Sequence, residues 1–423
     1  MDMLDDFVTL AQICPGMTND KITNALTVWF GHTFIFTHWE YVGDTGKGDS
    51  YLSEVLRVRL HGTDRRFKPD YVQAILKNIP KNTSRRLTFR SSEFFKNEIG
   101  FYERVLPALL NFQSTKEVKD PFDNHAKLIF TYCDGVNDVV CLEDATTHSF
   151  RSVNTRQIGI DFVHSKLALK ALAKYHAISF AMKDQKPEEF DKIKKEIFET
   201  YYHERLRSWY LRFWSRIGKI AVDAVEKEFP GSIYVEKVKQ FVAPERYDDM
   251  INAACNTLEN GVISHGDTWT NNFLFKYRDA QPVDAMIIDF QLARCATPVL
   301  DISFMMYACT SQDLRVQHYD ELLKHYYEVL STQIREMGSD PEKVYSWGTF
   351  MAEIKKYSFF GLAFSFESTP FIVLPPEDAI TMIFEGDTQM DINDVWKIGP
   401  FRTREGRLRE ANNVKHAVDM GYI

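Results

Sequence analysis

The chain has 423 residues, of which 44% are apolar and 26% are charged. This usage is typical of globular proteins and excludes a disordered or fibrous chain, and the length predicts two or three domains or lobes. With 51 basic and 59 acidic residues the formal net charge is −8, which argues against a general binder of nucleic acid or anionic membranes.

Cysteine usage and the N-terminus predict a reduced, cytoplasmic protein. The six cysteines show no CxxC spacing and no accompanying histidine cluster, so neither a disulfide framework nor a zinc knuckle is expected. The first six residues are acidic where a secretory signal would be basic. The longest uncharged run, between Lys21 and Glu40, contains many polar residues, so no membrane span is expected.

The first third of the chain predicts a small sheet. Residues 33–42 and 51–60 are rich in aromatic and β-branched side chains, and residues 71–76 predict a third strand that ends at Lys77. A hairpin is expected from residues 127–132 and 138–142, on either side of a turn.

Helical patterns dominate the rest of the chain. A helix is expected over residues 91–106, stopped near Pro107, and another over 161–182. Two short apolar strands, 272–277 and 285–290, interrupt the helical pattern. The prediction is an α+β fold with a small β-rich N-terminal lobe, residues 1–145, and a larger, mostly helical C-terminal lobe, residues 146–423.

The sharpest chemical signal is the octapeptide HGDTWTNN at residues 265–272, which has the pattern H-x-D-x-x-x-x-N. In phosphoryl transfer the Asp of such a loop accepts the proton of the attacking hydroxyl, and the Asn amide oxygen binds magnesium. Asp267 and Asn272 are therefore candidates for those two roles. An ordinary turn that contains Asp and Asn is the structural alternative.

A second carboxylate follows 22 positions after Asp267. The segment MIIDF at residues 286–290 predicts an apolar strand that ends at Asp289, paired in a hairpin with the strand after Asn272. Mg²⁺ prefers hard oxygen ligands, usually one or two carboxylates together with substrate phosphates. Asp289 is therefore the expected second metal ligand.

The N-terminal third supplies a complementary set of residues. Gly43, Gly46 and Gly48 lie in a turn between two predicted strands, where small residues let backbone N–H groups approach phosphates. An ordinary β-hairpin is the alternative for this turn. Lys77 and Glu98 are spaced as a lysine–glutamate pair that can hold the α and β phosphates. A solvated lysine at a strand end is the alternative, and Glu93 competes with Glu98 on the same helix.

The order of these features resembles the ecdysteroid kinase-like (CHK kinase-like) family, which is related to choline and aminoglycoside phosphotransferases. The resemblance extends from the glycine turn to beyond Asp301. Its motifs are GDSYLS at 48–53, FKNE at 95–98, LED at 142–144, LAKYHA at 172–177, HGDTWTNN at 265–272 and IDFQ at 288–291. The glycine turn departs from the family, with Asp49-Ser50-Tyr51 in place of Glu-Asn-Tyr and a G-x-x-G-x-G spacing.

This resemblance implies a protein-kinase-like bilobal fold, ATP and Mg²⁺ as cofactors, and a small-molecule alcohol as acceptor. An ecdysteroid or another sterol-like or xenobiotic alcohol is the expected acceptor. The resemblance also implies that Ser50 joins the glycines at the phosphates, and that Glu143 and Ala145 offer backbone groups to adenine. His265 is expected to orient the catalytic loop. His176 and Asp301 are expected to be buried and structural.

Three further interpretations stay open at this point. The acceptor could be choline, ethanolamine or an aminoglycoside-like amine alcohol. The chain could be a pseudokinase that binds nucleotide or steroid without turnover, although the intact Asp267, Asn272, Asp289 and Lys77 argue against it. The aromatic run at residues 201–214 is typical of a helix core, but it could also form the wall of an apolar acceptor pocket.

Overall fold

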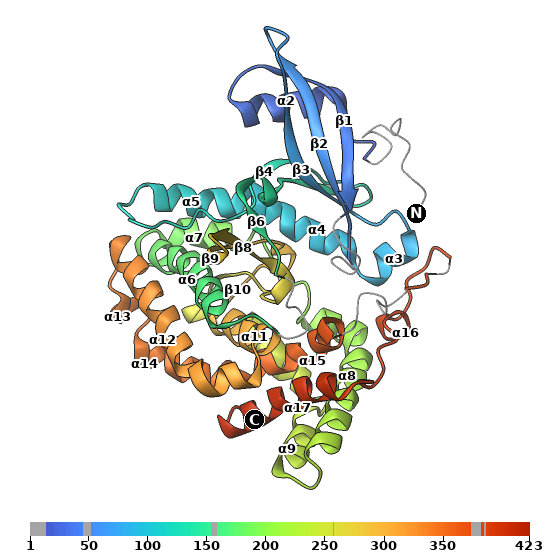
Figure 1. Cartoon of the computed structure of the whole chain (residues 1–423), viewed down its shortest axis with the longest axis vertical. Coiled ribbons are helices and arrows are strands. Elements are labelled where there is room, and N and C mark those ends of the chain that lie inside the picture. The colour runs from blue at the N-terminus through green and yellow to red at the C-terminus, as the bar shows by residue number, and fades with distance from the viewer. Residues whose placement is uncertain (1–13, 45–51, 154–158, 257, 374–381, 385) are drawn as a thin grey trace.

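Figure 1 shows a small β-rich part at the top of the molecule and a larger, mostly helical part below it. The computed structural model describes residues 14–44, 52–153, 159–256, 258–373, 382–384 and 386–423. The upper sheet uses residues up to 143, and the long helices of the lower part all follow it. The predicted α+β architecture of a small N-terminal sheet region and a larger helical region is confirmed.

The upper sheet has five antiparallel strands in the order β1-β2-β3-β5-β4. Apolar residues alternate along β2, between β1 and β3, where Leu56, Val58 and Leu60 are buried. The helix α2 (Asn19–Phe30) packs its buried Ile22 and Leu26 into the same core cluster. The strands are β1 (Phe34–Asp44), β2 (Glu54–Asp64), β3 (Pro69–Asn78), β4 (Leu128–Tyr132) and β5 (Val139–Glu143).

The helical segment after β3 differs from the prediction. Short α3 (Thr83–Thr88) is followed by α4 (Ser91–Gly100), a π-helical turn (Phe101–Val105) and α5 (Leu106–Ser114). The chain therefore passes through Pro107, and the expected stop there is wrong. Proline lacks an N–H and its ring crowds the preceding helical turn, and the wider π-turn immediately before it accommodates both effects.

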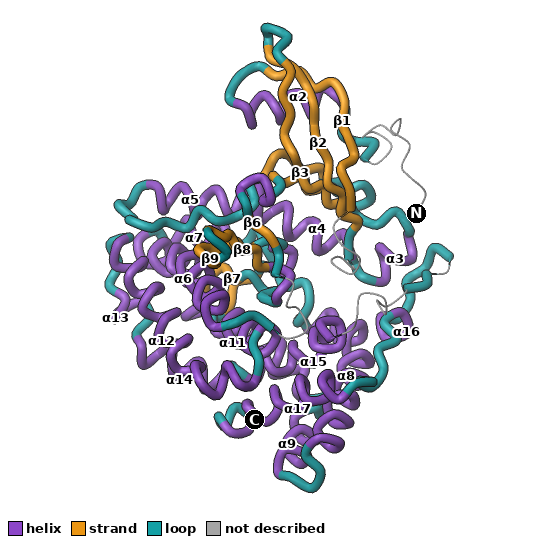
Figure 2. The backbone as a smooth tube through the Cα atoms, viewed as in Figure 1, coloured by secondary structure: helices purple, strands orange, loops and turns teal. Residues whose placement is uncertain are grey.

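A second, smaller sheet of order β6-β8-β9 lies between the helices, as Figure 2 shows in orange. Its strands are β6 (Phe150–Arg151), β8 (Phe273–Arg278) and β9 (Gln281–Ile287), and β7 (Val262–Ser264) pairs separately with β10 (Arg294–Ala296). The predicted strand over 285–290 is wrong at its end, because β9 stops at Ile287. Asp289 has φ 69°, a left-handed conformation that cannot continue a strand.

The remaining core is built from helices. The long α6 packs against α12, and α11, which is buried along its whole length, packs against α15. Within the described residues, none of the helices combines the length and the apolar run needed to cross a bilayer. The helices are α6 (Phe162–Gln185), α7 (Pro187–Ile193), α8 (Arg207–Glu228), α9 (Ile233–Phe241), α10 (Arg246–Cys255), α11 (Val299–Cys309), α12 (Gln312–Glu336), α13 (Pro341–Val344), α14 (Trp347–Tyr357), α15 (Phe359–Val373), α16 (Ile392–Val395) and α17 (Arg404–Asp419).

Candidate active site

Lys77, near the end of β3, lies at the centre of a buried cluster of charged residues. Its ammonium nitrogen lies 2.7 Å from Glu98 Oε2 on α4 and 2.8 Å from Asp289 Oδ1 beyond β9. The predicted Lys77–Glu98 pair is therefore present. The competing Glu93 points elsewhere, because its carboxylate pairs with Arg90 at 2.9 Å and with Arg205 at 2.6 Å.

Burial and charge act in opposite directions on this cluster. Burial alone would lower the pKa of Lys77, but the carboxylates of Asp289 and Glu98 outweigh it and raise that pKa, so the lysine is held as a cation. Burial raises the pKa of Glu98, which the Lys77 charge opposes. A charged ammonium near the end of β3 is suited to binding phosphate oxygens.

The catalytic-loop candidates are joined to each other by hydrogen bonds. Asn272 Nδ2 donates to the Asp267 backbone carbonyl at 2.8 Å and to Asp267 Oδ2 at 3.0 Å. Because the amide nitrogen is turned toward Asp267, the amide oxygen of Asn272 faces away from it. Burial, together with the charge of Asp289, raises the pKa of Asp267 to about 8. The Ile288 N–H donates to the Asn272 carbonyl at 3.1 Å, which holds the residue before Asp289 against the catalytic loop.

The buried carboxylate of Asp301 holds the backbone at the start of the catalytic loop, residues 265–272. Asp301 on α11 accepts hydrogen bonds from the backbone N–H groups of His265 at 2.6 Å and Gly266 at 2.8 Å. His176 on α6 lies 3.0 Å from the same carboxylate through Nε2. Burial would raise the pKa of Asp301, but the His176 hydrogen bond and charge outweigh it and lower that pKa. The structural roles expected for Asp301 and His176 agree with these contacts.

His265 and Gly266 connect the loop to the segment that carries Asp289. His265 Nδ1 accepts from the Asp267 N–H at 3.2 Å, so Nε2 carries the proton and donates to the Ile288 carbonyl at 2.8 Å. Gly266 has φ +85°, and a Cβ there would lie 2.0 Å from the carbonyl oxygen of Leu292. The two segments therefore approach so closely that only glycine fits between them.

Two buried residues of the site were given no role from the sequence. Gln291 Oε1 accepts a hydrogen bond from Lys77 Nζ at 3.2 Å. Asn97, next to Glu98 on α4, donates to the backbone carbonyls of Gln291 at 3.1 Å and Ala293 at 2.8 Å. Both residues lie in family-like motifs, FKNE and IDFQ, which is the signal that could have indicated them.

The expected phosphate turn is only partly visible. Gly43 was expected in the turn, but it lies in β1 opposite Arg57, with φ 154° beside a register shift in the β1–β2 pairing. Gly46, Gly48 and Ser50 lie outside the described residues. Their expected part in binding phosphates therefore stays a prediction.

The expected adenine-contacting residues lie where the upper sheet ends. Glu143 is the last residue of β5, and Ala145 opens a 3-10 turn (Ala145–His148). Asp144 lies buried between them and accepts hydrogen bonds from Arg57 and Gln73, each at 2.8 Å. These bonds fix the backbone that follows the sheet.

The aromatic run at 201–214 mostly belongs to the core. Its members Tyr201, Tyr202, Tyr210, Phe213 and Trp214 are buried in the main apolar cluster, and Trp209 is half-buried. The hydroxyl groups of Tyr201 and Tyr210 both donate hydrogen bonds to the buried carboxyl group of Glu367 on α15. The buried positions of these rings favour the interpretation as helix core over that as an open pocket wall.

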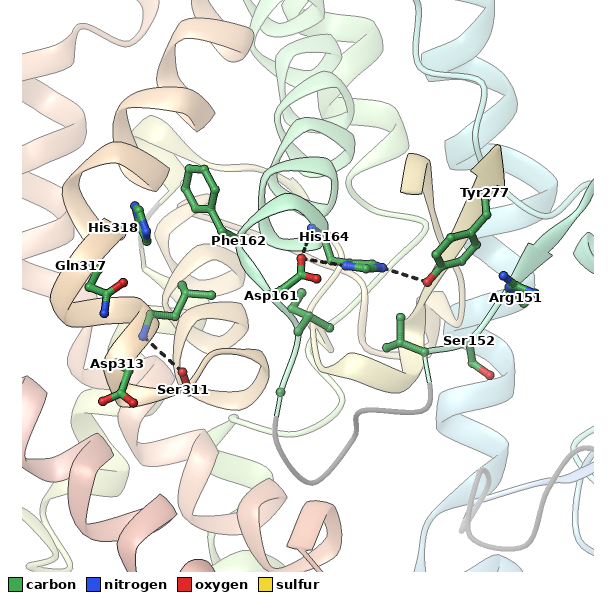
Figure 3. Close-up of a pocket in the computed structure, with 14 residues that line it drawn as sticks. Arg151, Ser152, Asp161, Phe162, His164, Tyr277, Ser311, Asp313, Gln317 and His318 are labelled. Atoms are coloured by element: carbon green, nitrogen blue, oxygen red, sulfur yellow. Dashed lines mark hydrogen bonds and ion pairs between the residues drawn. The ribbon is translucent and has the colours of Figure 1, made fainter. Parts of the chain in front are cut away.

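A separate pocket of about 790 Å³ lies where the N-terminal ends of α6 and α12 meet the β8–β9 hairpin (Figure 3). His164 lines the pocket and connects two other lining residues, with Nδ1 2.8 Å from Asp161 Oδ1 and Nε2 2.8 Å from the Tyr277 hydroxyl. Neither Lys77 nor Asp267 lines this pocket. It is therefore distinct from the cluster around Lys77.

The donor set of the site fits magnesium rather than a metal held by protein alone. Among the described residues, no group of three or more His, Cys, Asp or Glu side chains is arranged to hold a metal ion. Mg²⁺ needs only one or two protein oxygens, because phosphates and water supply the rest. Asp289, with a partly exposed carboxylate, and the amide oxygen of Asn272 are donors of that kind.

Comparisons with solved structures found several kinases of low sequence identity. Solved structures similar to the chain include an ethanolamine kinase from Plasmodium vivax, with 12% identity, coverage of 91% of this chain and 84% of the other, and a TM-score of 0.40. A GDP complex of an aminoglycoside 2′-phosphotransferase has 13% identity, coverage of 83% and 97%, and a TM-score of 0.35. A glucosamine kinase has 8% identity, coverage of 88% and 94%, and a TM-score of 0.29.

A search of curated protein sequences found no match. The model of the ecdysteroid kinase-like family matches residues 47–339, which is well over half of the chain and contains every residue of the Lys77 cluster and the catalytic loop. The chain therefore belongs to the ecdysteroid kinase-like family and is a small-molecule kinase.

Proposed function

We propose that the protein transfers the γ-phosphoryl group of ATP, with Mg²⁺, to a hydroxyl group of an ecdysteroid or another sterol-like or xenobiotic alcohol. The observation that carries the proposal is the Lys77 cluster. The ammonium of Lys77, in the N-terminal sheet, lies within 2.8 Å of a carboxylate oxygen of Glu98 on α4 and of one of Asp289. Asp289 follows Lys77 by more than 200 positions in the sequence. In this proposal residues 1–145 form the nucleotide-binding lobe and residues 146–423 the lobe that carries the catalytic loop.

The nucleotide end of the reaction is assigned to Lys77 and Glu98. Lys77 contacts the α and β phosphates, and Glu98 holds the ammonium in place before the nucleotide arrives. The turn with Gly43, Gly46, Gly48 and Ser50 is assigned to the phosphates, and the backbone of Glu143 and Ala145 to adenine. The burial of Glu98, whose side chain is 1% exposed, supports a fixed position for the lysine.

The metal end is assigned to Asn272 and Asp289. Their oxygens would hold Mg²⁺, which when bound neutralises negative charge on the phosphates. The hydrogen bond from His265 to the Ile288 carbonyl supports this assignment, because it ties the loop of Asn272 to the residue before Asp289. This hydrogen bond would keep the two assigned ligands in a fixed position relative to each other.

The acceptor end is assigned to Asp267, which orients the attacking hydroxyl and takes its proton. The Asn272 amide fixes the Asp267 carboxylate by the hydrogen bond at 3.0 Å, so the base is positioned before the acceptor binds. Positioning and electrostatic stabilisation then supply most of the rate enhancement. The choice of a sterol-like acceptor rests on family membership.

An ATP-consumption screen tests this function. The purified chain is incubated with Mg·ATP and one acceptor from each class, namely ecdysteroids, other sterols, phenolic glycosides and choline, and the product is examined by mass spectrometry. We expect an increase of one phosphate in an ecdysteroid or another sterol-like or xenobiotic alcohol, and a rate of product formation about 10² to 10⁴-fold lower in the Asp267→Asn control. Phosphorylated choline alone would contradict the acceptor class, and nucleotide binding without any product would favour a pseudokinase.

A further inference from the structure

Lys77 has a third hydrogen-bond acceptor besides its two carboxylates. An ammonium group carries three N–H donors, and here they are directed at Glu98, Asp289 and, at 3.2 Å, the amide oxygen of Gln291. Gln291 is 6% exposed, so its amide is a buried partner rather than a surface one. All three donors of a buried cation are thereby used.

The neutral charge of Gln291 has a physical consequence. The cluster already contains two carboxylates for one ammonium, and a third carboxylate would add negative charge next to the site assigned to phosphates. An amide oxygen satisfies the remaining donor without adding charge. It also gives Lys77 an anchor that does not depend on Asp289, the carboxylate assigned to the metal.

Asn97 holds the backbone of Gln291 in place. It is fully buried on α4, its amide nitrogen donates to the Gln291 and Ala293 carbonyls, and its amide oxygen accepts from the Phe198 N–H at 2.9 Å. One side chain therefore joins the helix of Glu98 to the segment after Asp289 and to the segment before α8. The ring of Phe101 strengthens the same junction by stacking on Phe290 with centroids 4.0 Å apart.

We propose that Asn97 and Gln291 are positioning residues for the nucleotide-binding lysine. Gln291 acts through its side-chain amide, which accepts from Lys77, and Asn97 acts through its hydrogen bond to the Gln291 backbone. This inference rests on the proposed function, because it assigns the lysine to the phosphates. Neither residue is expected to touch the reacting atoms.

The test compares nucleotide binding in variants of Gln291 and Asn97 with that in a matched control variant. Gln291→Leu removes the third acceptor, and we expect the Kd for Mg·ATP and the KM for ATP to rise about tenfold while kcat changes by less than about threefold. The matched control is Gln113→Leu, since Gln113 is an equally buried glutamine of α5 whose amide bonds the Phe122 backbone and no other described residue. The control is expected to lose thermal stability with its Kd unchanged.

Asn97→Leu supplies a readout that needs no nucleotide. Because Asn97 Oδ1 accepts the Phe198 N–H, we expect hydrogen–deuterium exchange at Phe198 to accelerate in the nucleotide-free protein. The Kd for Mg·ATP should also rise, and the double variant Asn97→Leu/Gln291→Leu should bind about as weakly as the weaker single variant, because both act through one residue. If Gln291→Leu does not fold, Gln291→Asn replaces it, since the shorter amide withdraws from Lys77.

The possible outcomes separate this inference from the function on which it rests. Wild-type affinity in Gln291→Leu, or an equal loss of affinity in Gln113→Leu, would overturn the positioning role while leaving the kinase assignment intact. Strictly additive effects of the two substitutions would contradict the assignment of Asn97 to the same task. Wild-type protein that does not bind Mg·ATP would instead overturn the proposed function.

Discussion

Replacing Lys77 by methionine is expected to reveal how strongly the buried charge cluster couples the two parts of the molecule. Methionine keeps most of the length and apolar stem of lysine but removes the ammonium. The side chains of Lys77 and Glu98 are 9% and 1% exposed, so the substitution leaves the buried Glu98 carboxylate without its cation and under the influence of the Asp289 charge.

The expected loss follows from that burial. Removing one partner of a buried ion pair costs about 3–5 kcal/mol of unfolding free energy, because the remaining charge is uncompensated. A solvent-exposed pair costs about 1 kcal/mol or less. Lys227→Met is the matched control, since Lys227 pairs with Asp223 at 2.9 Å on the surface of α8, with side chains 52% and 31% exposed.

Chemical denaturation followed by tryptophan fluorescence measures these free energies, and a second substitution isolates their cause. Lys77→Met/Glu98→Gln replaces the stranded carboxyl by a neutral amide, and we expect it to recover at least half of the stability lost in Lys77→Met. If Lys77→Met costs no more than Lys227→Met, or if the double variant is no more stable than the single one, the reasoning from buried charge is refuted.

Three other substitutions test separate parts of the structure. Asp289→Ala is expected to weaken Mg·ATP binding by at least tenfold in a calorimetric titration, with little effect on metal-free nucleotide, and an unchanged magnesium dependence would count against the metal assignment. Gly266→Ala places a methyl group 2.0 Å from the Leu292 carbonyl in a left-handed backbone, so we expect a loss of about 2 kcal/mol or more in denaturation, and wild-type stability would contradict the close approach. Burial raises the pKa of Glu410 from 4.5 to about 8, so the folded protein binds a proton that the unfolded chain releases, and stability should fall as pH rises across that range. Glu410→Gln should flatten this part of the curve of melting temperature against pH, and an unchanged slope would show that another group is responsible.

The sheet of the N-terminal part could be predicted because local pattern and tertiary structure agree there. β2 buries every second residue, as its apolar alternation indicates, and β3 presents Lys77 where its strand pattern ends. The H-x-D-x-x-x-x-N loop could be located for a different reason. Its spacing is fixed by the chemistry, and Asp267 and Asn272 do meet through a hydrogen bond at 3.0 Å.

Features that depend on distant contacts were not predictable in the same way. Pro107 was expected to end its helix, but the π-turn before it lets the helix continue, and the pattern of apolar residues does not distinguish the two. The left-handed turn at Asp289 is held by the Lys77 contact and by the packing of Phe290 on Phe101. Both partners are remote in sequence, so a strand was the natural expectation for that segment.

The roles of Asn97 and Gln291 show a further limit. Each lies beside a residue that the sequence did indicate, Glu98 and Asp289, but a lone buried amide has no spacing rule of its own. Only the folded chain shows that the Asn97 amide donates to the backbone carbonyl of Gln291, 194 positions away in sequence.

The most direct test of the kinase assignment measures binding and turnover on one variant, Asp267→Asn. With an acceptor found in the ATP-consumption screen, we expect phosphoryl transfer to fall by about 10² to 10⁴-fold, because the base that orients and deprotonates the hydroxyl is lost. The Kd for Mg·ATP should stay within about threefold of wild type, since Asp267 is assigned to the acceptor and not to the nucleotide. Turnover that survives the substitution, or a loss of nucleotide binding with turnover retained, would contradict the account.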